Sequence, residues 1–137
     1  MVKKVVYKGA NISYSCLGNA QRTVMLIHGF LESKKVWNDY AKVLSKHNTV
    51  YSIDLPGHGE SECLGYVHSM EDMAGCVKKV LEDNNKRKAV IVGHSLGGYV
   101  ALAFGDKYPD ALKGLCLFNS TAKPDTEEKV KFRNRAI

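Results

Sequence analysis

The pentapeptide GHSLG at residues 93–97 places Ser95 between two glycines. An apolar, β-branched run precedes it at residues 89–92, and a helix-like segment follows at residues 98–104, so the serine is predicted at a strand-to-helix turn. Such a turn holds the serine in a strained backbone conformation and presents its Oγ beside the unpaired N–H groups of a helix N-terminus. This is the placement that a nucleophilic serine requires.

Two more segments are expected at the same edge of the sheet. The sequence HGF at residues 28–30 follows an apolar run, and DLPGHGES at residues 54–61 follows the next one. Ligands of open α/β sheets bind at the carboxyl ends of parallel strands. We therefore expect both segments to lie close to Ser95. His94 is expected to point away from the serine, because it adjoins Ser95 on a sharp turn.

The elements that position these residues alternate between strand and helix. Two serines, Ser33 and Ser69, are placed as helix N-caps, and Asp72 lies at the capping-box position of the second helix. This alternation predicts an α/β fold, a mostly parallel sheet with flanking helices. Strands are expected at residues 5–8, 11–16, 23–27, 49–53, 89–92 and 115–118, and helices at residues 36–44, 70–81 and 98–104.

Taken together and in this order, the H-G-F, D-L-P-G-H-G-x-S and G-H-S-L-G-G segments resemble the α/β-hydrolase superfamily, in its branch of soluble esterase-like enzymes. The resemblance implies that Ser95 is the nucleophile and that the backbone N–H groups of Phe30 and Leu96 form the oxyanion hole. It makes His28 a scaffold residue near that hole. It implies no cofactor and no metal. Dehalogenases and epoxide hydrolases of this superfamily carry an aspartate at the nucleophile position, so Ser95 argues against both.

Substrate-binding residues are less well indicated. Phe30, Leu31, Leu64 and Tyr99 are candidates for an apolar acyl site, and each also fits a place in the core. Asp54 and His58 are expected to bond to their own turn.

The sequence departs from the family in its catalytic partners. Serine triads on this fold follow the order Ser, Asp/Glu, His, but no histidine follows Ser95 and Asn119 stands where some members place the acid. The triad acid and histidine are therefore absent from this chain. We expect an incomplete α/β-hydrolase fold that lacks the lid and the last strands, with residues 1–122 forming the amino-terminal part of the core and residues 123–137 beginning the lid.

Three functions follow from these patterns. The first is a serine hydrolase acting on a carboxylic ester or a related small acyl compound. This activity is expected of the complete enzyme, of which these residues form the amino-terminal part. The second is a catalytically inactive α/β fragment that persists by association. The third is a non-hydrolytic relative, either a lyase or a cofactor-free haloperoxidase-like enzyme, because fold does not fix chemistry. The apolar run at residues 115–118 would form an exposed edge, so we expect a dimer or swapped assembly through it.

Composition further limits the functions, partners and location expected of the chain. The 137 residues fit one domain, and a net charge of +6 comes from lysines scattered in pairs without interleaved aromatic residues, so a nucleic-acid partner is not expected. No apolar run approaches the ~20 residues of a membrane span, and no secretory signal is apparent, so we expect a cytoplasmic protein without a membrane partner. Four cysteines without metal-ligand spacing are expected to be reduced and mostly buried: Cys16, Cys63, Cys76 and Cys116.

Overall fold

A computed structural model of the chain describes residues 1–135, apart from the side chain of Arg133. Its centre is a six-stranded sheet with the order β1-β2-β4-β3-β5-β6. Strands β3, β4, β5 and β6 run parallel, whereas β2 pairs antiparallel with both β1 and β4. The strands are β1 (Val2–Tyr7), β2 (Ala10–Leu17), β3 (Thr23–Ile27), β4 (Thr49–Ile53), β5 (Ala89–His94) and β6 (Leu112–Phe118).

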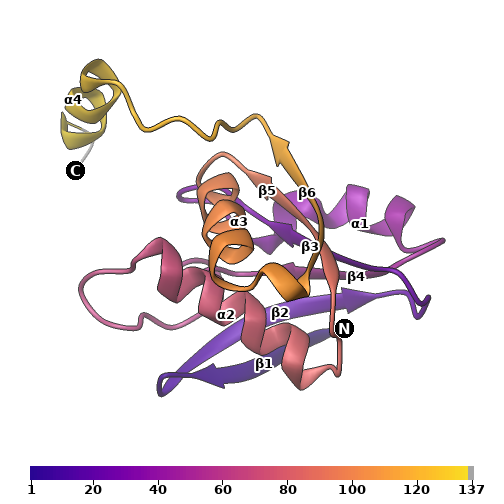
Figure 1. Cartoon of the computed structure of the whole chain (residues 1–137). Helices are drawn as coiled ribbons and strands as arrows, with labels where there is room; N and C mark the ends of the chain where they lie inside the picture. The colour runs from indigo at the N-terminus through magenta and orange to yellow at the C-terminus, as the bar shows by residue number, and fades with distance from the viewer. Residues whose placement is uncertain (136–137) are drawn as a thin grey trace.

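Helices cover the two faces of this sheet unequally (Figure 1). Helices α2 (Met70–Asp83) and α3 (Leu96–Lys107) pack against one face, and α1 (Asn38–Leu44) lies on the other. Short 3-10 helices precede α1 at Lys34–Trp37 and β6 at Pro109–Ala111. Helix α4 (Glu127–Arg135) stands apart from the sheet at the end of an extended segment (Figure 1). The predicted α/β class, with a mostly parallel sheet between helices, is confirmed.

The larger hydrophobic core lies under α2 and α3. Phe104 of α3 and Ile91 of β5 are among its fully buried members. A smaller cluster on the opposite face joins Val24 and Val50 to Trp37 and other residues near α1. Strands β3 and β4 are buried along their whole length, which is typical of central parallel strands and matches the continuous apolar runs at residues 23–27 and 49–53.

The first predicted helix differs from the observed one. Residues 36–44 were expected to form one amphipathic helix, but the chain forms a 3-10 helix before α1, with Ser33 Oγ accepting from the Lys35 N–H (3.4 Å). Val36, Tyr40 and Val43 are exposed although their spacing predicts a buried face. Within residues 1–135, α1 is the only α-helix packed on this face, so no other helix covers these three side chains, although the Tyr40 ring contacts those of Trp37 and Phe118.

Two other details of the sequence interpretation need correction. The Ser69 cap forms, with Ser69 Oγ accepting from the Asp72 N–H (3.0 Å), but the Asp72 carboxylate pairs with Lys8 Nζ (2.6 Å). The expectation of mostly buried cysteines was wrong, because only one of the four is fully buried. Cys76 lies in the core under α2, Cys16 is half-buried, and Cys63 and Cys116 are exposed. Cys116 is exposed because β6 ends the sheet.

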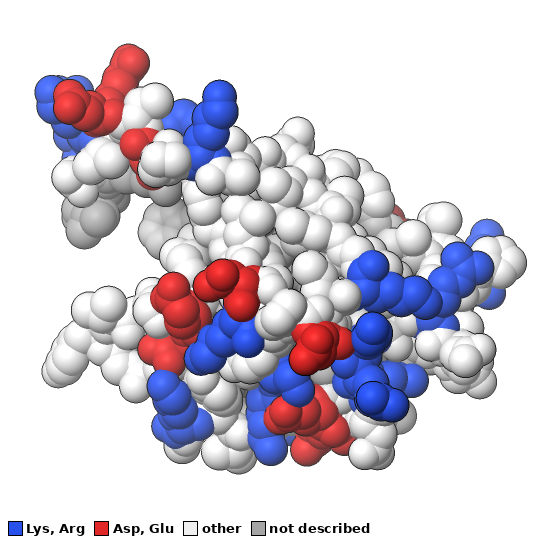
Figure 2. All heavy atoms as spheres, in the orientation of Figure 1, with Lys and Arg blue, Asp and Glu red and all other residues white. Residues whose placement is uncertain are grey.

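Strand β6 forms the apolar edge expected from residues 115–118. Among the described residues it pairs with β5 alone, and Leu115 and Phe118 are exposed. The surface in Figure 2 shows acidic and basic side chains interspersed over α2. Within residues 1–135, no helix has the length and apolar character to cross a bilayer.

Candidate functional site

Ser95 occupies the sharp turn between β5 and α3, with φ 53° and ψ −114°. A non-glycine residue rarely adopts this left-handed conformation, so the turn stores strain at the serine. Two glycines make the turn sterically feasible. A Cβ on Gly93 would collide with the carbonyl of Gly97, and a Cβ on Gly97 would collide with the backbone oxygens of Ile27 and His28. The predicted strand-turn-helix geometry around Ser95 is therefore present.

The end of β6 anchors this turn. The Ser95 N–H donates to the carbonyl of Phe118 (3.3 Å), and Ser120 Oγ donates to the carbonyl of Ser95 (2.8 Å). The same carbonyl accepts from the Gly98 N–H (2.9 Å). Sequence reasoning missed Ser120, because a single serine after a strand carries no distinguishing signal.

Two backbone donors lie beside Ser95. Leu96 is the first residue of α3, so its N–H has no partner within the helix. Phe30 lies in the loop after β3, and within residues 1–135 neither its N–H nor that of Leu96 donates to another group. Phe30, Ser95 and Leu96 line one cavity of about 1110 Å³. A polar atom of a ligand in this cavity can therefore meet free N–H groups next to a serine hydroxyl.

His28 holds the loop that carries Phe30. The Leu55 N–H donates to His28 Nε2 (3.0 Å), so Nδ1 carries the proton and donates to the Gly29 carbonyl (2.7 Å). The ring is fully buried, and burial lowers the pKa of His28 below its ordinary value. With both nitrogens engaged, His28 has no position from which to accept a proton from Ser95. Its geometry is that of the scaffold residue expected from the sequence.

His94 points away from the serine, as expected, and its Nδ1 lies 3.1 Å from Glu32 Oε2. The same oxygen accepts from the Gly29 N–H (2.8 Å). Although burial alone would raise the pKa of Glu32, these contacts with Gly29 and His94 lower it below its ordinary value. Glu32 thus ties the Gly29 loop to the residue before Ser95. No sequence motif had identified it.

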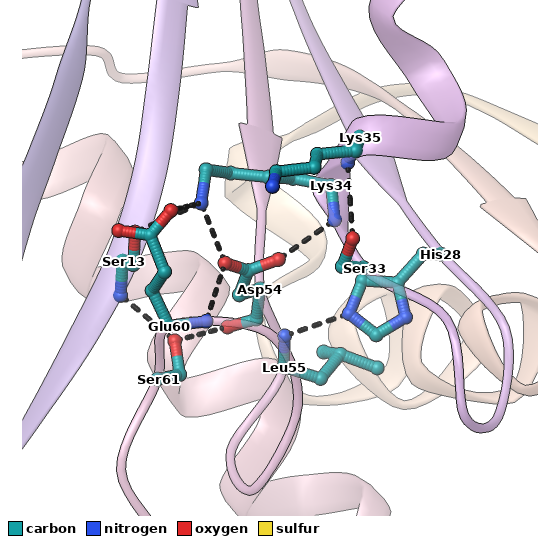
Figure 3. A network of polar contacts seen from close by, with 9 residues as sticks. All are labelled: Ser13, His28, Ser33, Lys34, Lys35, Asp54, Leu55, Glu60 and Ser61. Atoms are coloured by element: carbon teal, nitrogen blue, oxygen red, sulfur yellow. Dashed lines mark hydrogen bonds and ion pairs between the residues drawn. The ribbon is translucent and has the colours of Figure 1, made fainter.

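A buried ion pair connects that loop to the turn after β4 (Figure 3). Lys34 Nζ lies 2.6 Å from Asp54 Oδ2 and 3.1 Å from Ser13 Oγ, and the Lys34 N–H donates to Asp54 Oδ1 (2.7 Å). The Glu60 N–H donates to Asp54 Oδ2 (3.0 Å), and Ser61 Oγ donates to the Asp54 carbonyl (2.7 Å). Asp54 therefore stabilises its own turn, as predicted, and also holds Lys34 in the interior, a burial that no sequence pattern predicted.

The ionisation of this pair follows from its contacts. Burial alone would raise the pKa of Asp54, but the N–H of Glu60 and the bonds from Lys34 hold it below its ordinary value. Burial alone would lower the pKa of Lys34, but Asp54 and Glu60 raise it. Both groups are therefore charged at neutral pH. His58, the other residue expected to bond to this turn, does so through Nδ1 and the Pro56 carbonyl (3.0 Å).

The four candidate substrate-binding residues separate into two pairs. Phe30 and Leu31 line the cavity beside Ser95. Tyr99 is not among its lining residues, and its hydroxyl donates to the Lys123 carbonyl (3.1 Å) and to Asp125 Oδ1 (3.4 Å). Leu64 packs against the main core. Tyr99 thus anchors the segment that leads to α4, and Leu64 has a structural contact.

In the part of the chain that the structure describes, no histidine is hydrogen-bonded to Ser95 Oγ to accept its proton. All five histidines precede Ser95 in the sequence, and none of the hydrogen bonds within residues 1–135 joins one of them to Ser95 Oγ. The site therefore combines a strained serine and free backbone donors without a proton acceptor.

Comparison with known proteins agrees with this geometry. The chain is 32% identical to the abhydrolase domain-containing protein abhd-5.2 of Caenorhabditis elegans, over 86% of this chain and 28% of that protein. It is 38% identical to the pimeloyl-[acyl-carrier protein] methyl ester esterase of Citrobacter koseri, over 72% of this chain and 36% of the esterase. A solved structure of a thermophilic esterase from Thermogutta terrifontis superposes with a TM-score of 0.88 and 33% identity.

That superposition covers 98% of this chain and 51% of the esterase. The chain thus spans about half or less of the length of these relatives. A family model described as the alpha/beta hydrolase fold matches residues 22–135, a range that contains Phe30, Ser95 and Leu96. With this match and these relatives, the chain belongs to the alpha/beta hydrolase fold family.

Proposed function

We propose that this chain carries the nucleophile and the oxyanion hole of a serine hydrolase that acts on a carboxylic ester or a related acyl compound. The observation that carries the proposal is the left-handed Ser95 at the end of β5, in one cavity with the free N–H groups of Phe30 and Leu96. The esterases among the relatives support the same reaction class.

In this reaction Ser95 Oγ attacks the acyl carbonyl carbon and loses its proton to a base. The carbonyl oxygen becomes an oxyanion that accepts hydrogen bonds from Phe30 and Leu96, and one such donor contributes roughly 2.7–4 kcal/mol to the transition state. The alcohol leaves with a proton, and water then hydrolyses the acyl-serine and restores the hydroxyl. Losing the histidine of a serine triad lowers kcat by about 2 × 10⁶, so we expect the chain on its own to turn over very slowly.

The test separates Ser95 reactivity from turnover. We expect a fluorophosphonate to form one adduct per chain, located at Ser95 by mass spectrometry and absent from Ser95→Ala. Added imidazole should accelerate labelling, because it supplies the missing base in solution. Ser45→Ala, which alters the serine at the C-cap of α1, should label like the parent chain. Equal labelling of Ser95→Ala, or a parent chain that imidazole leaves unlabelled, would overturn the proposal.

We also propose that copies of the chain associate through β6. The support is an exposed apolar edge strand that pairs on one side alone within residues 1–135, because an uncovered edge of this kind pairs readily with other strands. Analytical ultracentrifugation should show a dimer whose population rises with concentration. Leu115→Lys should shift it to monomer, whereas Tyr66→Lys, in an exposed loop, should leave it unchanged. A parent chain that stays monomeric throughout the concentration series would contradict this association.

A further inference from the structure

The cavity over Ser95 has two walls of different character. Its floor comes from the loop after β3 and from the turn at Ser95, and its far wall comes from α4 and the residue before it. The lining residues are Phe30, Leu31, Ser95 and Leu96 on the floor, and Thr126, Glu128, Lys129, Lys131, Phe132 and Arg135 on the far wall. A ligand with its carbonyl at Ser95 therefore extends towards α4.

Apolar side chains on both walls are available to a ligand. Phe30, Leu31 and Phe132 are 63%, 80% and 73% exposed, although all three line the cavity. Covering this area with a hydrocarbon chain removes apolar surface from water and is favourable. An acyl chain between the Phe30 loop and Phe132 meets this requirement.

The charges on the far wall are unbalanced. Lys129, Lys131 and Arg135 line the cavity with one acid, Glu128. Within residues 1–135, none of these four side chains forms an ion pair. Lys131 and Arg135 are four residues apart on α4 and thus share a face. Figure 2 shows both charge signs on α4, and three of the four charged residues that α4 contributes to the cavity are cationic.

We propose that the substrate is an amphiphilic acyl compound with an anionic group, a carboxylate or a phosphate, at a distance from its reacting carbonyl. Its acyl chain lies between Phe30, Leu31 and Phe132, and its anionic group pairs with Lys131 and Arg135. Arg and Lys bind carboxylate and phosphate through charge-assisted hydrogen bonds, which are stronger than neutral ones. This inference rests on the proposed hydrolase function, which supplies the position of the reacting carbonyl.

The experiment measures binding in Ser95→Ala, so that no reaction is needed. Calorimetry compares monomethyl suberate, which has one free carboxylate, with dimethyl suberate, the neutral ester of the same chain. We expect the monoester to bind about tenfold more tightly, the difference that one charge-assisted contact provides. Monooctyl phosphate against octanol forms the second arm, and the larger of the two preferences identifies the anionic group.

Variants connect the preference to α4. Lys131→Gln with Arg135→Gln should abolish the preference for the anion while leaving the neutral ligands unchanged, and Lys131→Arg with Arg135→Lys should retain it. Lys3→Gln with Lys4→Gln, on β1, is the matched control for loss of two positive charges and should have no effect. Equal binding of the anionic and neutral partners in both arms would overturn the inference, as would a preference that survives the glutamine pair.

The outcome stays separate from that of the hydrolase test. A charge preference in Ser95→Ala without fluorophosphonate labelling of the parent chain would overturn the proposed hydrolase function and still support the anion site. Labelling of Ser95 without any charge preference would overturn the anion site alone and support the hydrolase function.

Discussion

Replacing Asp54 with alanine is expected to lower the free energy of unfolding by about 3–5 kcal/mol, because it leaves a buried lysine without its principal partner. The Lys34 and Asp54 side chains are 5% and 0% exposed, with 2.6 Å between Nζ and Oδ2. The substitution also removes the acceptor for the N–H groups of Lys34 and Glu60. Glu60 does not compensate, since its contact with Lys34 is longer (3.2 Å) and the carboxylate is half-exposed.

Urea denaturation of the two chains measures this difference. Asp39→Ala is the matched control, because Asp39 and Lys42 form an exposed pair at 3.9 Å, and exposed pairs contribute about 0–1 kcal/mol. A variant with Lys34→Met and Asp54→Leu together should recover the part of the stability that the unpaired charge costs, but not the part lost with the acceptor of the Lys34 and Glu60 N–H groups. If Asp54→Ala unfolds at the same urea concentration as Asp39→Ala, the ion pair does not stabilise the fold.

The same pair predicts a pH dependence. The pKa of Asp54 in the folded chain is below its ordinary value, so its stabilising contribution is complete above about pH 4 and is lost as the pH falls through the folded pKa. Stability measured between about pH 5 and pH 2 should therefore fall less steeply in Asp54→Ala than in the parent chain. Parallel curves for the two chains would show that Asp54 titrates with the same pKa in the folded and unfolded states.

Replacing Gly97 with alanine is expected to reduce the fluorophosphonate labelling rate of Ser95 by about 100-fold, the effect of a displacement of about 1 Å at a reacting group. The new Cβ would contact two backbone oxygens, those of Ile27 and His28. Neither oxygen belongs to a flexible side chain, so α3 must move away from β3 and take the Leu96 N–H with it. Overpacking of this kind lowers stability by about 1–3 kcal/mol.

Gly114→Ala is the control for this substitution. A Cβ there would lie 3.6 Å from Val90 Cγ2, an ordinary contact, so labelling should be unchanged. Circular dichroism and urea denaturation establish that Gly97→Ala remains folded before the rates are compared. A folded Gly97→Ala that labels at the parent rate would show that the turn around Ser95 tolerates a side chain at this position.

Local patterns predicted the elements that depend on a residue's immediate neighbours. Strands β3 and β4 match their predicted residues, because a continuous apolar, β-branched run between polar turns fits a buried strand. The Ser69 cap and the Gly93–Gly97 elbow were predicted for the same reason, since both depend on residues within one turn of each other. The exposure of Val43 and Cys116 was not predicted, because burial depends on which other elements lie against a residue.

The sequence by itself determined the α/β alternation, the strained turn at Ser95 and the absence of a histidine after it, since each is a property of residue type and spacing. Only the tertiary structure decided that Lys34 is buried against Asp54, that Glu32 joins the Gly29 loop to His94, and that α4 faces the serine across an open cavity. The Lys34–Asp54 and Glu32–His94 contacts join residues 20 and 62 positions apart in the chain. Such residues meet through the order of strands in the sheet, which no local pattern encodes.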